Sequence, residues 1–185
     1  KINRRDFIKL AGLGGAVFAS GLRGWAGAAK KAGADEFYFV QLSDTHWGFS
    51  GPKVNPEAAG TLKKAVAAVN GLEQKPDFVV FTGDLTHTTD DPKVRRGRMA
   101  EFRDIVSELK VKEVRFLAGE HDASLDRGEA YQEFFGKRYY TFDHQGAHFI
   151  VLDNVSDPAA ALGEAQLAWL KQDLKQLRQD TPIVV

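Results

Sequence analysis

The chain has 185 residues, of which 25 are basic and 25 acidic, so its formal net charge is zero. A hydrophobic fraction of 43% excludes a disordered chain, and the balanced charge gives no support to a nucleic-acid-binding surface. The lack of cysteine excludes disulfides, thiolate metal sites and a cysteine nucleophile. No apolar run is long enough for a conventional membrane-spanning helix.

The N-terminal segment, residues 1–28, differs in composition from the rest of the chain. Arg4 and Arg5 come first, a weakly hydrophobic run rich in Gly and Ala follows, and Ala26 and Ala28 form an A-x-A-like cleavage pattern. This order is typical of an export signal, and the paired arginines resemble a twin-arginine signal. An amphipathic surface helix with a chance arginine pair is the alternative. We therefore predict a twin-arginine signal peptide, the twin-arginine export machinery as a partner, and a periplasmic or exported product.

Strand and helix patterns alternate after residue 35. Short aromatic and β-branched runs predict strands at residues 36–42, 77–82 and 113–117. Apolar residues at helical spacing predict two connecting helices, the first capped at Asn55 before Pro56 and the second around residues 99–109. This order predicts consecutive right-handed βαβ units and a parallel sheet, which is an α/β fold.

The last third of the chain has a different pattern. Residues 138–142 and 147–152 predict a hairpin, and leucines at helical spacing from 167 to 177 predict a third helix. Residues 182–185 begin another strand. We therefore expect residues 29–185 to form one domain that is incomplete at its C-terminus.

Polar clusters follow each of the three strands of the predicted parallel sheet. They are Asp44-Thr45-His46, Gly83-Asp84 and Gly119-Glu120-His121-Asp122. Each cluster alone is an ordinary turn sequence, but ligand crevices form beyond the carboxyl ends of parallel strands, where all three would meet. Carboxylates and imidazoles together suit Mn, Fe or Zn, and a central carboxylate such as Asp84 can bridge two metals.

The three clusters resemble the pattern of the calcineurin-like metallophosphoesterase family, D-x-H, then G-D, then G-N-H-D or G-N-H-E. Residues 139–153 resemble the hairpin of that family, and residues 166–170 resemble a helix of the branch that includes cyclic-nucleotide phosphodiesterases. The resemblance covers residues 36–185. It implies the N-terminal portion of a four-layer α-β-β-α sandwich and the hydrolysis of phosphomonoesters or phosphodiesters.

The resemblance also implies roles for single residues. The implied ligands of two metal ions are Asp44, His46, Asp84 and Glu120, with Asp84 shared between the ions. A metal-bound hydroxide would attack phosphorus. His121 would stabilise charge or protonate the leaving oxygen, and Asp122 would orient its ring. His87 has a weaker claim as a crevice residue, and His144 and His148 are expected to be hairpin residues.

Two features depart from the family pattern. Glu120 stands where the family has Asn, so it either ligates the second metal or points away and leaves that position weak. No histidine follows His148, whereas the family has further histidines later in the chain. We therefore expect a fragment that lacks part of the second metal site and is inactive by itself.

Two other readings remain open. A non-catalytic metal-binding or structural module would also explain Glu120 and the lack of later histidines. A nucleotide-binding domain is disfavoured because no G-x-G-x-x-G follows the first strand.

Overall fold

The computed structural model describes residues 18–21 and 37–185, so most of the predicted export signal lies outside the described residues. Residues 18–21 form a strand, β1 (Phe18–Gly21), which the sequence patterns do not predict. Within the described ranges, no helix is both long and apolar enough to cross a membrane.

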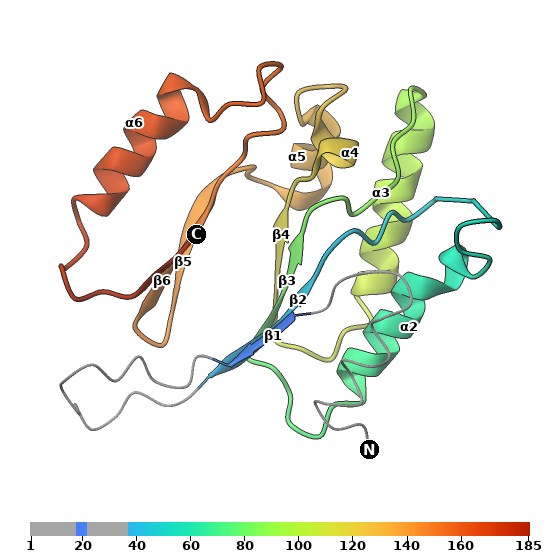
Figure 1. Ribbon diagram of the computed structural model, residues 1–185, viewed down its shortest axis with the longest axis horizontal. Coiled ribbons are helices and arrows are strands. Elements are labelled where there is room, and N and C mark those ends of the chain that lie inside the picture. The colour runs from blue at the N-terminus through green and yellow to red at the C-terminus, as the bar shows by residue number, and fades with distance from the viewer. Residues whose placement is uncertain (1–17, 22–36) are drawn as a thin grey trace.

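A four-stranded sheet carries the candidate site (Figure 1). Its order is β1-β2-β3-β4, where β2 is Tyr38–Leu42, β3 is Phe78–Thr82 and β4 is Glu113–Leu117. The last three strands run parallel, in register Val40↔Val79↔Val114, and β1 pairs antiparallel with β2. The three predicted strands and the parallel sheet are therefore confirmed.

Two helices connect the parallel strands, α2 (Ala58–Asn70) and α3 (Pro92–Val106). α3 begins where Asp91 accepts hydrogen bonds from the backbone N–H groups of Lys93 and Val94, and Pro92 fits its first turn. The predicted start of α2 was too early. Asn55 accepts a hydrogen bond from the Glu57 N–H, at 3.0 Å, and closes a turn ahead of the helix instead of capping it.

Two hydrophobic clusters lie on opposite faces of this sheet. The larger one fills the space between the sheet and the helices, with Leu62 and Val66 of α2 and Met99 and Phe102 of α3 at its centre. The smaller one joins this sheet to a second sheet through Phe39, Phe78, Ala147 and Phe149. The alternation of side chains along each strand produces both clusters from the same sequence.

The second sheet has three strands, in order β5-β6-β7. These are β5 (Tyr140–His144), β6 (Ala147–Val151) and β7 (Ile183–Val184), with β7 parallel to β6. The predicted hairpin is confirmed, but its turn is only Gln145-Gly146, because both residues adopt positive φ and close a two-residue turn.

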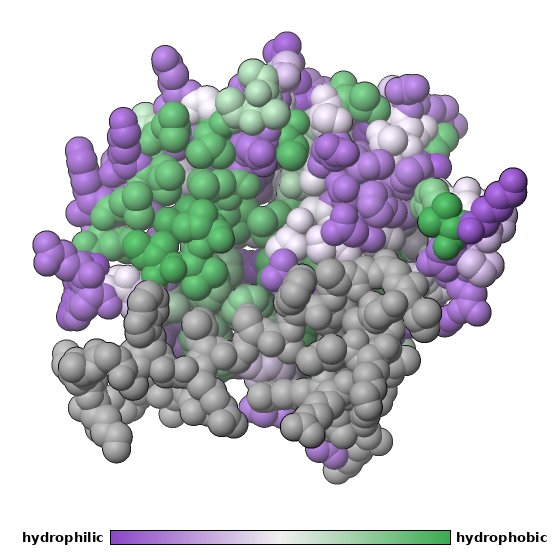
Figure 2. All heavy atoms as spheres, in the orientation of Figure 1, coloured by the Kyte–Doolittle hydropathy of each residue, from purple (hydrophilic) through white to green (hydrophobic). Residues whose placement is uncertain are grey.

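The third predicted helix is α6 (Gly163–Leu174), which covers the outer face of the second sheet (Figure 1). Its side of the molecule carries many hydrophobic residues on the surface (Figure 2). Leu167 and Leu174 are exposed there, and the one buried residue of α6 is Gln166. Helices, sheet, sheet and helix thus give the α/β sandwich that the sequence predicts.

Candidate metal centre

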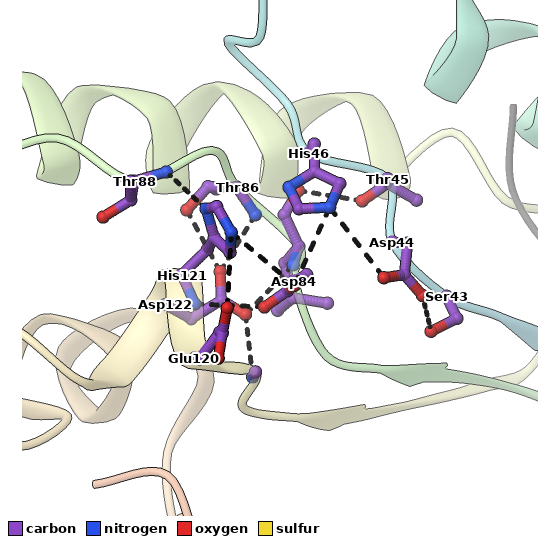
Figure 3. A network of polar contacts seen from close by, with 12 residues as sticks. Ser43, Asp44, Thr45, His46, Asp84, Thr86, Thr88, Glu120, His121 and Asp122 are labelled. Atoms are coloured by element: carbon purple, nitrogen blue, oxygen red, sulfur yellow. Dashed lines mark hydrogen bonds and ion pairs between the residues drawn. The ribbon is translucent and has the colours of Figure 1, made fainter.

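Three loops meet at the carboxyl ends of β2, β3 and β4 (Figure 3). The Asp44 N–H donates to the Gly83 carbonyl at 3.2 Å, and the His46 N–H donates to the Asp84 carbonyl at 2.9 Å. Trp47 continues this alignment with an N–H bond to the Leu85 carbonyl, also at 2.9 Å. The loops after β2 and β3 therefore form one hydrogen-bonded ribbon that carries the polar side chains.

The backbone of this ribbon has an uncommon conformation. Asp44, His46 and Asp84 have φ values of 56°, 43° and 47°, in the left-handed region that residues with a side chain rarely adopt. Such conformations persist only where surrounding contacts hold them, and they gather at functional sites. Three expected metal ligands thus share an uncommon backbone conformation that contacts between the loops hold in place.

Glycines allow the third loop to approach the second. A Cβ atom on Gly119 would lie 2.1 Å from the Asp84 backbone nitrogen and 2.2 Å from its Oδ1 atom. Gly83 has a φ of +99°, and a Cβ there would lie 2.9 Å from the Gly119 Cα. The His121 N–H can therefore reach Asp84 Oδ1, at 3.0 Å. The two glycines that precede the expected ligands are required by this close approach.

One group of expected ligands comes together. Ligand atoms of Asp44, His46 and Asp84 lie within 4.8 Å of one another. His46 Nε2 lies 3.8 Å from Asp44 Oδ1 and 3.7 Å from Asp84 Oδ2. Two atoms that each lie about 2.0–2.2 Å from one cation have separations of this order, so the donor set fits a divalent cation.

His121 lies beside this group and is held by a backbone donor. Its Nε2 atom is 4.0 Å from Asp84 Oδ2, and its Nδ1 atom accepts a hydrogen bond from the Thr88 N–H at 3.1 Å. A neutral imidazole that accepts at Nδ1 carries its proton on Nε2. The N–H of the ring is therefore presented on the same side as the carboxylate of Asp84 (Figure 3).

Asp122 has partners other than those expected. It is 1% exposed, and its carboxylate accepts hydrogen bonds from the N–H groups of Leu85, Thr86 and Gly119 and from the Thr86 hydroxyl, at 2.9–3.1 Å. Burial raises its pKa, while these hydrogen bonds act in the opposite direction. Asp122 thus ties the β4 loop to the β3 loop, while the hydrogen bond to the ring of His121 comes from the Thr88 N–H, so the orienting role expected for Asp122 stays a prediction.

Glu120 differs from its neighbours in exposure. Its side chain is 75% exposed, and Oε1 lies 3.8 Å from His121 Nε2. It is the first residue of a short helix, α4 (Glu120–Ala123), and it joins neither of the potential metal-binding groups found among the described residues. Its expected role as a ligand of a second metal therefore stays a prediction.

His87 lies closer to the candidate metal centre than its weak claim from the sequence suggested. Nitrogen atoms of His46, His87 and His121 lie within 4.8 Å of one another. The pKa of His87 is lowered, chiefly by burial and then by the positive charges that His121, His46 and Arg98 can carry. The sequence signal for this placement was the position of His87 only three residues after Asp84, which puts both side chains in the loop that follows β3.

The other two histidines belong to the second sheet. His148 is buried, with Nδ1 2.6 Å from Asp143 and Nε2 3.0 Å from Asp173 of α6. His144 Nε2 lies 3.4 Å from Asp77, and its ring contacts Phe37 and Phe78. Both are hairpin residues away from the metal centre, as predicted.

Arg98 of α3 also supports the candidate site, although no sequence pattern indicated this role. Its Nη1 atom donates to the carbonyls of His87, at 2.7 Å, and Thr88, at 3.0 Å. It thereby fixes the backbone whose next donor, the Thr88 N–H, holds His121. No periodicity or motif marks such a residue, because its role depends on the crossing of α3 over the β3 loop.

Comparison with known proteins agrees with this geometry. The family model of the calcineurin-like phosphoesterases matches residues 37–184. The chain is 32% identical, over 166 residues, to the serine/threonine-protein phosphatase CPPED1 of Rattus norvegicus, which covers 77% of this chain and 52% of that protein. It is 28% identical to the CPPED1 protein of Danio rerio, over 83% of this chain and 55% of that protein.

A bacterial relative is similar at the same level. A protein of Rhodopseudomonas palustris described as a "probable cyclic nucleotide phosphodiesterase" is 28% identical over 160 residues, which are 80% of this chain and 55% of that protein. The chain thus spans about half the length of the curated relatives it matches.

Proposed function

Because the chain belongs to the calcineurin-like phosphoesterase family, we propose that it forms the metal-binding half of an enzyme that hydrolyses phosphoesters. The observation that carries this proposal is the convergence of Asp44, His46 and Asp84 on one point at the carboxyl ends of the parallel strands. The printed names of the relatives include phosphatases and phosphodiesterases, which supports either phosphomonoesters or phosphodiesters as substrates.

Each residue would have a distinct task. Asp44, His46 and Asp84 would hold one cation, of Mn, Fe or Zn, and Asp84 would share a second cation with Glu120. Bound ions would supply Lewis acidity and an acidified water for attack on phosphorus. His121 would donate its Nε2 proton in a hydrogen bond to a phosphoryl or leaving oxygen, which neutralises charge that develops in the transition state.

A second candidate function is a metal-binding module without catalysis. The exposure of Glu120 favours this alternative, because a second cation held mainly by Asp84 would bind weakly. The two candidates agree on the first metal position and differ on turnover. Metal content and hydrolysis must therefore be measured separately.

The test is an isosteric substitution in the intact protein that carries this chain. Asp84→Asn removes the shared carboxylate charge but keeps an oxygen for the His121 N–H, so bound metal and hydrolysis of bis(p-nitrophenyl) phosphate with Mn²⁺ should both be lost. Asp90→Asn, an exposed loop carboxylate, is the matched control and should change neither. His121→Gln should keep the metal and lower turnover by about 10²–10⁴-fold.

The outcomes separate the candidates. Loss of metal in Asp84→Asn together with hydrolysis by the wild type supports the enzyme. Stoichiometric metal without hydrolysis of phosphomonoesters or phosphodiesters supports the module. Undiminished metal in Asp84→Asn would contradict both and would displace the metal centre from these loops.

A further inference from the structure

Arg98 of α3 carries a positive charge that forms no ion pair with a carboxylate within the part of the chain that the structure describes. Its Nη1 atom donates instead to the main-chain carbonyls of His87 and Thr88, at 2.7 and 3.0 Å. Glu101, three residues later on the same helix, accepts a hydrogen bond from the indole N–H of Trp47, at 2.8 Å. A guanidinium placed on backbone carbonyls requires an explanation, since its strongest partners are carboxylates and phosphates.

The loop after β2 fixes the place of Arg98. Gly48 of that loop has a φ of +90°, and a Cβ atom there would lie 2.4 Å from Arg98 Nε and 2.6 Å from Arg98 Cδ. The arginine side chain therefore packs against the backbone of Gly48, in space that the missing glycine side chain leaves open. α3 thus places one cation between the loops that follow β2 and β3, and both loops carry candidate metal ligands.

One peptide group connects Arg98 to His121. The His87 carbonyl, which accepts from Arg98, and the Thr88 N–H are the two polar ends of the same planar amide. That N–H donates to His121 Nδ1 at 3.1 Å (Figure 3). The amide therefore has a cation at its carbonyl end and an imidazole at its N–H end.

A cation at one end of such a chain strengthens the hydrogen bond at the other end. Hydrogen bonds from ionised donors are roughly twice as strong as neutral ones, and consecutive hydrogen bonds polarise one another. The Arg98 charge draws electron density toward the His87 oxygen, which makes the Thr88 N–H a stronger donor. Because the His121 ring accepts this bond at Nδ1, its proton stays on Nε2, which lies 4.0 Å from Asp84 Oδ2.

We propose that Arg98 is a positioning residue that polarises the His87–Thr88 peptide group and thereby holds His121 with its proton on Nε2. The inference rests on the proposed function only where that proton is donated to a phosphoryl or leaving oxygen of a substrate. Arg98 acts through the amide and not on the candidate metal ligands. Its loss should therefore slow turnover and leave bound metal in place.

The first test detects this connection by nitrogen-15 NMR in the intact protein, without added metal. The wild type should show a scalar coupling across the hydrogen bond between the Thr88 amide nitrogen and His121 Nδ1, assigned by its loss in His121→Gln. Arg98→Met keeps an unbranched side chain against Gly48 but removes the guanidinium, so it should reduce the coupling and move the Thr88 amide proton upfield. Arg103→Met, the same change at an exposed position of α3, should alter neither. A wild type without the coupling overturns the proposal, even if Arg98→Met fails to fold.

The second test separates turnover from binding, with bis(p-nitrophenyl) phosphate and Mn²⁺. We expect Arg98→Met to lower kcat by about 10–100-fold, which is part of the roughly 10²–10⁴-fold effect of losing a general acid. KM should stay within about twofold of the wild type, because an interaction made only in the transition state affects kcat alone. Bound metal should be unchanged, and Arg103→Met should match the wild type throughout.

Where the wild type is active, the proposal stands only if the coupling and kcat fall together while bound metal is kept, and any other combination overturns it. Failure of the proposed function would look different. If the wild type hydrolyses neither phosphomonoesters nor phosphodiesters but shows a coupling that depends on Arg98, the phosphoesterase assignment is wrong and Arg98 still holds the ring. If the wild type hydrolyses the substrate without the coupling, only the role of Arg98 is wrong.

Discussion

At the scale of single residues, the metal centre depends on how closely backbones approach. Asp44, His46 and Asp84 hold positive φ values where hydrogen bonds join the loops after β2 and β3, and the absence of side chains at Gly83 and Gly119 lets the loop after β4 approach Asp84. The convergence of these candidate ligands could be predicted from sequence, since each follows a strand. The positive φ values could not, because they arise from contacts between segments distant in the chain.

Gly119→Ala tests this close approach. The new Cβ would lie 2.1 Å from the backbone nitrogen of Asp84, which cannot move without breaking the bond that its carbonyl accepts from His46. We expect the free energy of unfolding, measured by urea denaturation, to fall by about 1–3 kcal/mol, as in other overpacked sites. Metal affinity should fall as well.

Gly97→Ala is the control for that substitution. Gly97 lies on the exposed side of α3, and a Cβ there meets nothing within 4 Å. Its free energy of unfolding should rise by about 0.5–1 kcal/mol, because alanine loses less backbone entropy in a helix. Equal stability of the Gly119→Ala variant and the wild type would show that the loops can separate freely.

Asp122→Asn decides between the two roles considered for that carboxylate. The structure gives Asp122 four hydrogen-bond donors, and among the described residues none of these donors is the His121 ring. The amide of the Asp122→Asn variant would therefore place an NH₂ donor against backbone N–H donors. We expect the free energy of unfolding to fall by more than about 2 kcal/mol, since hydrogen bonds to charged groups contribute roughly 1.5–3 kcal/mol each.

The tautomer of His121 supplies the second readout for this variant. Nitrogen-15 NMR should show its Nε2–H form in both the wild type and Asp122→Asn, because Thr88 holds the ring. Asp104→Asn, on the exposed side of α3, should change neither property. A variant with wild-type stability and an altered His121 tautomer would restore the orienting role.

At the scale of secondary-structure elements, α6 is joined to the second sheet by a buried histidine. His148 of β6 lies between Asp143 of β5 and Asp173 of α6. Burial lowers its pKa, but the hydrogen bonds and charges of the two carboxylates outweigh burial, and the net effect raises the pKa. An ion pair is therefore one of the links that hold α6 beside the second sheet, together with the contact of the Trp169 ring with Tyr139.

The stability of this link should depend on pH. Because the folded-state pKa of His148 is raised, its stabilisation is complete below the unfolded value of about 6.5 and is lost as pH rises through the folded value. Asp173→Asn should lower the free energy of unfolding by roughly 1.5–3 kcal/mol at pH 6 and by less at pH 9. Glu164→Gln, an exposed change in α6, should leave the pH profile between 6 and 9 unchanged. If the free energy of unfolding changed with pH in the same way in the wild type and in Asp173→Asn, the ion pair between His148 and Asp173 would be contradicted.

Helices long enough to show a hydrophobic periodicity could be predicted from the sequence, whereas the short helices could not. α2 and α3 span 13 and 15 residues, long enough for an apolar face to repeat. α4 (Glu120–Ala123) and α5 (Glu129–Phe135) span four and seven, so neither shows a period in the sequence. The helical position of Glu120 was missed for this reason, whereas the exposure of its side chain agrees with one of the two orientations expected for it.

At the scale of the whole molecule, the predicted export signal overlaps the first sheet. β1 (Phe18–Gly21) lies within residues 1–28 and pairs with β2. The paired arginines remain the basis of the export proposal, and both lie outside the described residues. Any processing of this segment would therefore change the edge of the sheet that carries the metal centre.

Export is tested by replacing Arg4 and Arg5 together with Lys. Charge is conserved while the paired guanidinium groups are lost, so we expect the protein to stay in the cytoplasm, as measured by cell fractionation. Arg23→Lys, in the same segment but outside the pair, should be exported normally. Periplasmic delivery of the double variant at the wild-type level would contradict a twin-arginine signal.

Cleavage after Ala28 would remove β1 and leave backbone groups of β2 unpaired on one side. We expect hydrogen–deuterium exchange to be faster across Tyr38–Leu42 in the processed protein than in the unprocessed one, because roughly half of the amides of a strand point to each neighbour. Phe78–Thr82 of β3 is an internal control, since it keeps β2 and β4 on its two sides. Equal protection of β2 in both forms would mean that another segment occupies the place of β1 after processing.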